Sequence, residues 1–199
     1  MFPDEQWRPL SLSTLREILS DAPFPWCLAG GYAVEMFVGR EFRFHSDVDI
    51  VIFREDQHAV QRHLNGWHLY ASDPPGTHRV WNDSEYLVEG IHDIWAYRNG
   101  QDHWECQFMI QEATGGTWFY RRDERVSGDV NNFIETYRDW PCIRIEIQLL
   151  YKSKALRAKD EEDFKQCLPL LDSSRRAWLA SKLRQLYSDS HPWLSRLNE

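Results

Sequence analysis

The spacing of apolar residues in the first fifty positions alternates between helical and extended patterns. In residues 11–20 the apolar side chains recur three or four positions apart, which predicts a helix with Ser11 as its N-cap. A short apolar run at 26–29, between a proline and two glycines, predicts a buried strand that turns sharply at its end. Residues 32–38 fit a short helix, and the near-continuous apolar run at 48–53 predicts a second buried strand.

The middle of the chain favours a meander of antiparallel strands. A helix is expected first, at 56–64, from apolar positions four residues apart. Residues 91–98 and 103–110 each alternate between apolar and polar side chains, and Asn99-Gly100 between them predicts a two-residue hairpin turn. A further strand is expected at 117–121, directly after a pair of glycines.

The last third of the chain has helical rather than alternating spacing. Helices are expected around 147–151, around 164–171 and from Ser173 or Ser174 to about 187, and a proline complicates the last turn of the second of them. The order of elements predicts the fold class α/β (α+β): a mixed lobe over residues 1–125 and a helical C-terminal segment over residues 126–199.

The composition argues against several classes of protein. The 199 residues carry 31 acidic and 23 basic side chains, a net charge of −8, which argues against a nucleic-acid partner held by a broad basic surface. We find no apolar run long enough to span a membrane and no signal-peptide pattern, so we expect a cytoplasmic protein. The four cysteines lie far apart, which favours neither a disulfide framework nor a zinc site. The ten tryptophans are expected mostly in the core.

Two acids and two glycines are the first candidates for chemistry. Residues i and i+2 of a strand share a face, so Asp47 and Asp49 are expected side by side, about 6–7 Å apart. Adjacent carboxylates at a buried strand need a positive partner, and Mg²⁺ prefers such oxygen ligands. Gly30 and Gly31 lead from a strand into a helix, where backbone N–H groups can hold phosphates. Taken singly, the acids are typical of a solvated strand end and the glycines of an ordinary turn.

Together these motifs resemble those of the nucleotidyltransferase superfamily, and most closely its aminoglycoside 2''-adenylyltransferase-like branch. The resemblance spans about residues 26–180, on Gly30-Gly31, Gly39-Arg40, Arg43, His45, Asp47 and Asp49, and on residues 92–95, 118–123, 146–152 and 159–164. It implies a nucleotidyltransferase-fold mixed sheet and an active site in the cleft between the lobe and the helical segment. It also implies Mg-dependent transfer of a nucleoside monophosphate.

The superfamily resemblance also implies a third carboxylate on a neighbouring strand. If Asn99-Gly100 forms a two-residue turn, Asp93 pairs with Cys106 on the apolar face of the hairpin. Glu105 then lies on the polar face, and we predict it as the third metal ligand or the general base. The alternative is an exposed strand glutamate. Gln107 stands where the resemblance suggests an acid, and this departure leaves a catalytically weak relative as an alternative function.

Four basic side chains are predicted to contact the nucleotide. Lys152 and Lys159 would stabilise the leaving pyrophosphate, and their spacing of seven places them on one face if the helix is unbroken. The alternative is pairing with the acids at 161–163, and Asp160 beside them could cap a junction between helices. Arg43 and His45 precede the acid pair and are predicted to contact phosphate. Alternatively, His45 orients the first of those acids.

The sequence therefore predicts an enzyme that transfers a nucleoside monophosphate, AMP from Mg-ATP, to a hydroxyl of a small molecule such as an aminoglycoside-like antibiotic. The predicted Mg²⁺ ligands and catalytic groups are Asp47, Asp49 and Glu105. Two alternatives stay open: a nucleotidyltransferase that acts on a tRNA or a protein, as a toxin would, and a relative that binds nucleotide without turnover.

Overall fold

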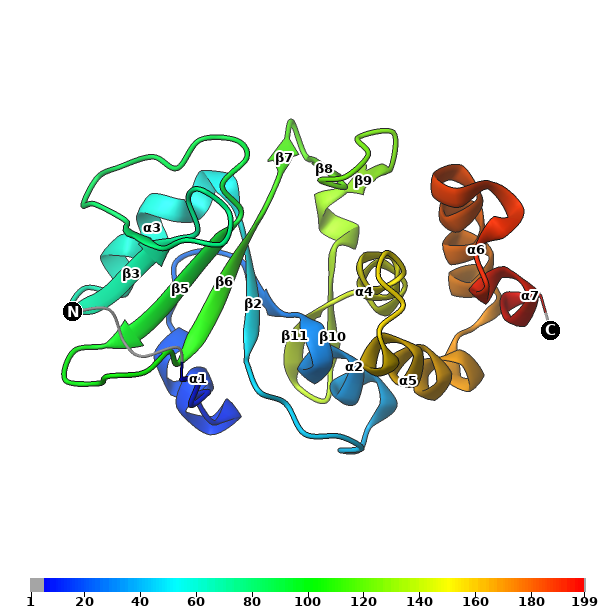
Figure 1. The fold of residues 1–199 in the computed structure, drawn as a ribbon, viewed down its shortest axis with the longest axis horizontal. Coiled ribbons are helices and arrows are strands. Elements are labelled where there is room, and N and C mark those ends of the chain that lie inside the picture. Colours follow the sequence, from blue (N-terminus) through cyan, green and yellow to red (C-terminus); the bar gives the residue numbers. More distant parts are fainter. Residues whose placement is uncertain (1–5, 199) are drawn as a thin grey trace. The chain divides into compact units, whose positions relative to one another are not determined.

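The structure is a computed structural model that describes residues 6–198, and the chain forms two compact units (Figure 1). The first unit contains the chain up to Leu28 and residues Arg43–Gly115. The second contains Ala29–Phe42 and the chain from Gly116 onward. The segment Ala29–Phe42, which the sequence places in the N-terminal lobe, therefore belongs to the second unit.

A mixed sheet forms the centre of the first unit. Its strands are β1 (Trp26–Leu28), β2 (Asp49–Phe53), β3 (Trp67–Ala71), β4 (Arg79–Val80), β5 (Asp93–Arg98) and β6 (Cys106–Gln111). They lie in the order β1-β2-β6-β5-β3-β4, and Figure 1 shows β2, β6, β5 and β3 side by side. The pair β2–β6 is parallel, whereas the other neighbouring pairs are antiparallel. This arrangement confirms the predicted α/β class.

Two helices cover one face of this sheet. They are α1 (Leu12–Leu19), which Ser11 caps as predicted, and α3 (Gln57–His63), which follows a short 3-10 turn at Arg54–Asp56. The indole of Trp26 on this face donates a hydrogen bond to the Leu19 carbonyl, and His63 contacts the Ile18 carbonyl. The strand residues on this face are buried and apolar, and include Ile50, Ile52, Leu69, Ile94, Phe108 and Ile110. Apolar burial against α1 and α3 thus supplies the core of the unit.

The second unit is mainly helical. Its helices are α2 (Gly30–Val38), α4 (Ile145–Lys152), α5 (Ala158–Cys167), α6 (Ser173–Tyr187) and α7 (Trp193–Leu197), with 3-10 turns at Val130–Asn132, Leu168–Leu170 and Ser188–Ser190. Two short hairpins join them, β8 (Thr117–Phe119) with β9 (Ser127–Asp129) and β10 (Ile134–Tyr137) with β11 (Trp140–Ile143). Helix α2 ends where predicted, because Gly39 adopts the left-handed conformation that glycine favours.

Short strands are what the sequence pattern missed. β3, β4, β9, β10 and β11 were not predicted, since runs of two to five residues show too few alternations to establish a period. The predicted helices and longer strands are present with ends shifted by up to three residues, except α5, which begins six residues and ends four residues before the predicted span. Among the described residues, we find no helix long and apolar enough to cross a membrane.

Candidate active site

The predicted acid pair lies at the entrance to β2. Asp49 is the first residue of the strand, and Asp47 lies two residues before it; both are half-buried. Asp49 and Val51 alternate with Ile50 and Ile52, which are buried beneath α1 and α3. Asp49 therefore lies on the opposite face of the sheet, away from those two helices.

The predicted pairing of β5 with β6 is wrong by three residues. Asn99-Gly100 does form a turn, in which the Gln101 N–H donates to the Arg98 carbonyl. However, Asp93 pairs with Met109 rather than with Cys106. An odd shift moves a strand residue to the other face relative to its partner. Asp93, predicted on the apolar face, consequently shares a face with Gln107.

This register brings a third carboxylate to the acid pair. Asp49 of β2 lies directly opposite Gln107 of β6, and the side chain of Gln107 donates a hydrogen bond to Asp93 Oδ1 at 2.9 Å. Asp49, Gln107 and Asp93 form what we call the carboxylate row. Sequence reasoning missed Asp93 because its face depends on the register, and the hairpin turn alone pointed to a different one.

Glu105, the predicted third carboxylate, precedes β6 and has a different set of partners. Its carboxylate accepts hydrogen bonds from the Arg98 backbone N–H at 2.8 Å and from the Arg98 Nε at 3.0 Å. Burial raises the pKa of Glu105, but the bonds from Arg98 outweigh burial and hold the pKa below its ordinary value. The Glu105 carboxylate is thus an ionised partner of Arg98, buried at the start of the strand.

The predicted phosphate contacts of the first unit lie just before the acid pair. Arg43 Nη1 lies 3.0 Å from the Nδ1 of His45, and Arg43 also donates to the Phe44 carbonyl. His45 is buried while Phe44 beside it is largely exposed. The contact fixes the His45 ring against Arg43, and the predicted phosphate contacts of both residues stay predictions.

The two glycines of the predicted phosphate turn begin helix α2. Gly30 has a φ of +63°, which an L side chain rarely adopts, and this explains why glycine opens the helix. The Gly30 N–H donates to Gln148 Oε1 of α4 at 2.8 Å. One of the N–H groups at this helix end is therefore satisfied within the second unit, and Gly31 follows it in the first turn.

The two predicted phosphate-binding lysines lie in different helices. Lys152 ends α4 and Lys159 lies in α5, because the chain breaks its helix between residues 153 and 157. Lys152 is buried, and its Nζ lies 2.7 Å from Asp163 and 3.7 Å from Asp160. Lys159 is exposed. The expectation of one shared helical face is wrong, whereas the alternative of pairing with nearby acids is confirmed for Lys152.

Comparison with known proteins identifies the family. A family model for aminoglycoside-2''-adenylyltransferase matches residues 11–167. The chain belongs to this family. It is a family of adenylyltransferases that modify small-molecule antibiotics, so membership implies ATP as a substrate. No curated protein sequence matches the chain.

Solved structures show the same fold at low identity. The lincosamide antibiotic adenylyltransferase LnuA, bound to lincomycin, is 17% identical with a TM-score of 0.54, over 80% of this chain and 97% of that one. ANT(2")-Ia in complex with adenylyl-2"-tobramycin is 14% identical with a TM-score of 0.55, over 88% of this chain and 97% of that one. These likenesses confirm the predicted nucleotidyltransferase fold.

Asp47 and the carboxylate row that follows it carry oxygen donors of the kind that a magnesium ion binds. Asp49 and Asp93 offer carboxylate oxygens, and Gln107 gives its N–H to Asp93, which leaves its amide oxygen as a further hard donor. Among residues 6–198, no three His, Cys, Asp or Glu side chains are arranged to hold a metal by themselves. Magnesium commonly uses one or two carboxylates together with substrate phosphates and water, so the residues present fit this ion.

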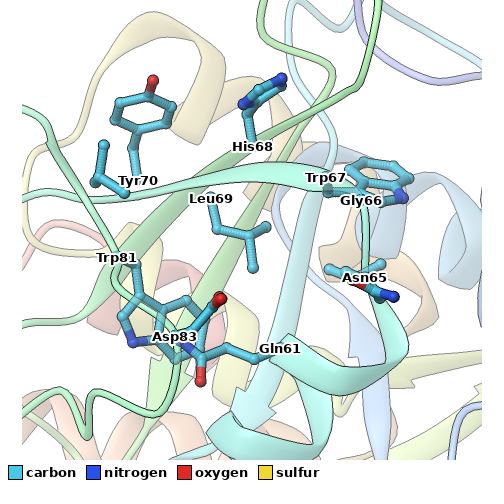
Figure 2. Close-up of a pocket in the computed structure, with 11 residues that line it drawn as sticks. Gln61, Asn65, Gly66, Trp67, His68, Leu69, Tyr70, Trp81 and Asp83 are labelled. Atoms are coloured by element: carbon cyan, nitrogen blue, oxygen red, sulfur yellow. The ribbon is translucent and has the colours of Figure 1, made fainter.

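A cavity of about 160 Å³ lies elsewhere in the first unit of this adenylyltransferase family member. Figure 2 shows Leu69 projecting from β3 toward Trp81 and Gln61, while His68 and Tyr70 project from the other side of the strand. The lining contains none of the residues of the carboxylate row. This cavity is therefore separate from the candidate site.

Proposed function

We propose that this protein transfers the adenylyl group of Mg-ATP to a hydroxyl of a small molecule. The observation that carries the proposal is the carboxylate row, in which Asp49 and Asp93 lie on either side of Gln107 on one face of the sheet. Membership of an adenylyltransferase family supports the same reaction.

In the proposed reaction the acceptor oxygen attacks the α-phosphorus of ATP. The new P–O bond forms as the bond to the β-phosphate oxygen breaks, and pyrophosphate leaves with the electron pair of that bond. The proton of the acceptor hydroxyl passes to a carboxylate, and Asp93 is the group we assign to accept it. Bound Mg²⁺ would neutralise charge on the phosphates, with Asp47 and Asp49 as its protein ligands.

Asp93 rather than Glu105 fits the third carboxylate position for a physical reason. The Glu105 carboxylate accepts both a backbone and a side-chain hydrogen bond from Arg98. If Glu105 turned away to bind a metal ion, it would break these bonds, which is costly for buried polar groups. Asp93 is half-buried, its Oδ1 accepts a hydrogen bond from the Gln107 amide, and it lies on the face of the sheet that Asp49 shares. The assignments of Gly30, Gly31, Arg43, His45, Lys152 and Lys159 to the nucleotide stay predictions, as does a cytoplasmic location.

Pyrophosphate release tests the proposal. The native protein is incubated with Mg²⁺, ATP and a panel of hydroxylated acceptors that includes lincomycin and tobramycin. Asp49→Asn and Asp93→Asn each keep the side-chain shape, and we expect each to lower turnover about 100-fold or more. Asp83→Asn, an exposed acid beside the separate cavity, is the matched control and should keep native turnover. Native turnover in Asp49→Asn, or no pyrophosphate release by the native protein with any acceptor, would reject the proposal.

A further inference from the structure

The carboxylate row continues across the sheet as a row of aromatic side chains. Trp95 of β5 lies directly opposite Gln107, and Tyr70 of β3 lies directly opposite Trp95. Side chains at paired positions project from the same face of a sheet. Asp49, Gln107, Trp95 and Tyr70 therefore line one face in order, from carboxylate to amide to indole to phenol.

The Trp95 indole is packed by other rings. His78 lies over it with ring centroids 4.0 Å apart, Trp7 meets it edge-on at 4.9 Å, and Trp104 meets it edge-on at 5.3 Å. Trp104 is buried, whereas Trp95, Trp7 and His78 are each half-buried. We call these three half-buried side chains the aromatic wall. The buried Trp104 ring packs against the wall, and the three half-buried rings keep surface that a ligand can contact.

The wall lies within reach of a molecule held at the carboxylate row. Neighbouring strands are about 4.8 Å apart, so the backbone of Trp95 lies about 10 Å from that of Asp49, two strands away. Trp95 and Asp93 lie two residues apart on one strand, which separates them by about 6–7 Å. A small acceptor with its hydroxyl at the carboxylates would thus place its neighbouring ring at the indole.

The chemistry of the wall favours an uncharged ring over a cation. The rings packed against Trp95 are those of His78, Trp7 and Trp104, and the buried acid of this hairpin, Glu105, is paired with Arg98. Burial lowers the pKa of His78, so the surroundings of the wall disfavour a positive charge. The amines of a polycationic ligand pack best beside carboxylates, and the wall itself contributes none, whereas the C–H face of a sugar or an apolar ring packs well against an indole.

We propose that Trp95, with Trp7 and His78 beside it, selects acceptors that lay an uncharged ring against the indole while their hydroxyl lies at Asp49 and Asp93. This inference rests on the proposed adenylyl transfer and adds to it the class of acceptor. It assigns Trp95 as a residue that determines acceptor specificity, without a part in nucleotide binding.

Steady-state kinetics of pyrophosphate release test this assignment with two probes. Lincomycin carries a sugar ring with little positive charge, whereas tobramycin carries several amines. We expect the native protein to prefer lincomycin, and Trp95→Ala to raise the lincomycin KM about tenfold, because one stacking contact is lost. Trp95→Phe should recover part of that loss, since it keeps an aromatic face. The KM for ATP should stay within about twofold of native in both variants.

Trp178→Ala is the matched control, because Trp178 is a half-buried tryptophan of α6 in the second unit. It should leave both KM values unchanged. An unchanged lincomycin KM in Trp95→Ala, or a native preference for tobramycin, would overturn the inference.

Calorimetric titration with lincomycin in the absence of ATP separates the two proposals, because it needs no turnover. If pyrophosphate release fails but lincomycin binds through Trp95, the reaction is wrong and the wall stands; if lincomycin does not bind, the wall is wrong.

Discussion

Replacing Lys152 with methionine tests whether this lysine serves the nucleotide or the fold. Its side chain is 7% exposed, and both carboxylates beside it, Asp160 and Asp163, are fully buried. Methionine is an unbranched side chain one atom shorter than lysine, so it keeps most of the volume but removes the charge. Two buried carboxylates would then lose their nearest ammonium group, and Asp163 would lose a contact of 2.7 Å.

The expected cost is large because the carboxylates stay buried. Removing one partner of a buried ion pair costs about 3–5 kcal/mol, since the buried charge left behind loses the opposite charge that compensated its desolvation. A chain of this size loses about 2–4 °C of unfolding temperature per kcal/mol, so we expect the transition to fall by about 6–20 °C. Arg157, which also bonds Asp160, offsets part of the loss for that carboxylate.

Calorimetry and pyrophosphate release are measured together on Lys152→Met. Lys159→Met is the control, because Lys159 is exposed on the neighbouring helix and its replacement should change stability by less than about 0.5 kcal/mol. A native unfolding temperature in Lys152→Met, combined with a loss of turnover, would refute this reasoning. That outcome would return Lys152 to the phosphate-binding role that its sequence position suggests.

Two further predictions concern other buried carboxylates. Glu105→Gln should lower the unfolding temperature by about 2–8 °C, the effect of about 1–2 kcal/mol, because Arg98 loses an ionised partner; pyrophosphate release should stay within about threefold of native. A loss of turnover with native stability would instead make Glu105 the third catalytic carboxylate. For Asp160, burial raises the pKa, but Arg157 and Lys152 outweigh burial and lower it. Its contribution to stability is therefore full above the unfolded pKa of about 3.9 and is lost as the pH falls through the lower folded value. Asp160→Asn should flatten the acid limb of a thermal unfolding series; an equally steep limb would contradict this.

Local sequence determined the helix ends and the strand start whose stabilising contacts lie within a few residues. Ser11 caps α1 through a bond to a backbone N–H three residues away, and Gly39 ends α2 through its own φ. The position of Asp49 at the start of β2 was also predictable from nearby residues, because the apolar run directly after it indicates a buried strand. Each of these signals lies within a few residues of the feature that it specifies.

The membership of the candidate site was decided by contacts between distant residues. The Asn99-Gly100 turn forms, but Trp104 beyond it pairs with Trp7 from the N-terminal segment and packs among the aromatic rings. Pairing with a segment about a hundred residues away can fix Trp104 where a tight hairpin would not. The strands then meet three residues out of the predicted register.

A turn motif favours a local conformation, whereas strand register follows from all the side chains that a sheet must bury at once. The sequence alone therefore determined the family, the α/β order of elements and the acid pair at Asp47 and Asp49. The tertiary structure decided that Asp93 lies beside Gln107, that Glu105 belongs to Arg98 and that Lys152 lies among buried carboxylates. Each of those outcomes depends on which face or which helix a side chain shares with residues far away in the chain.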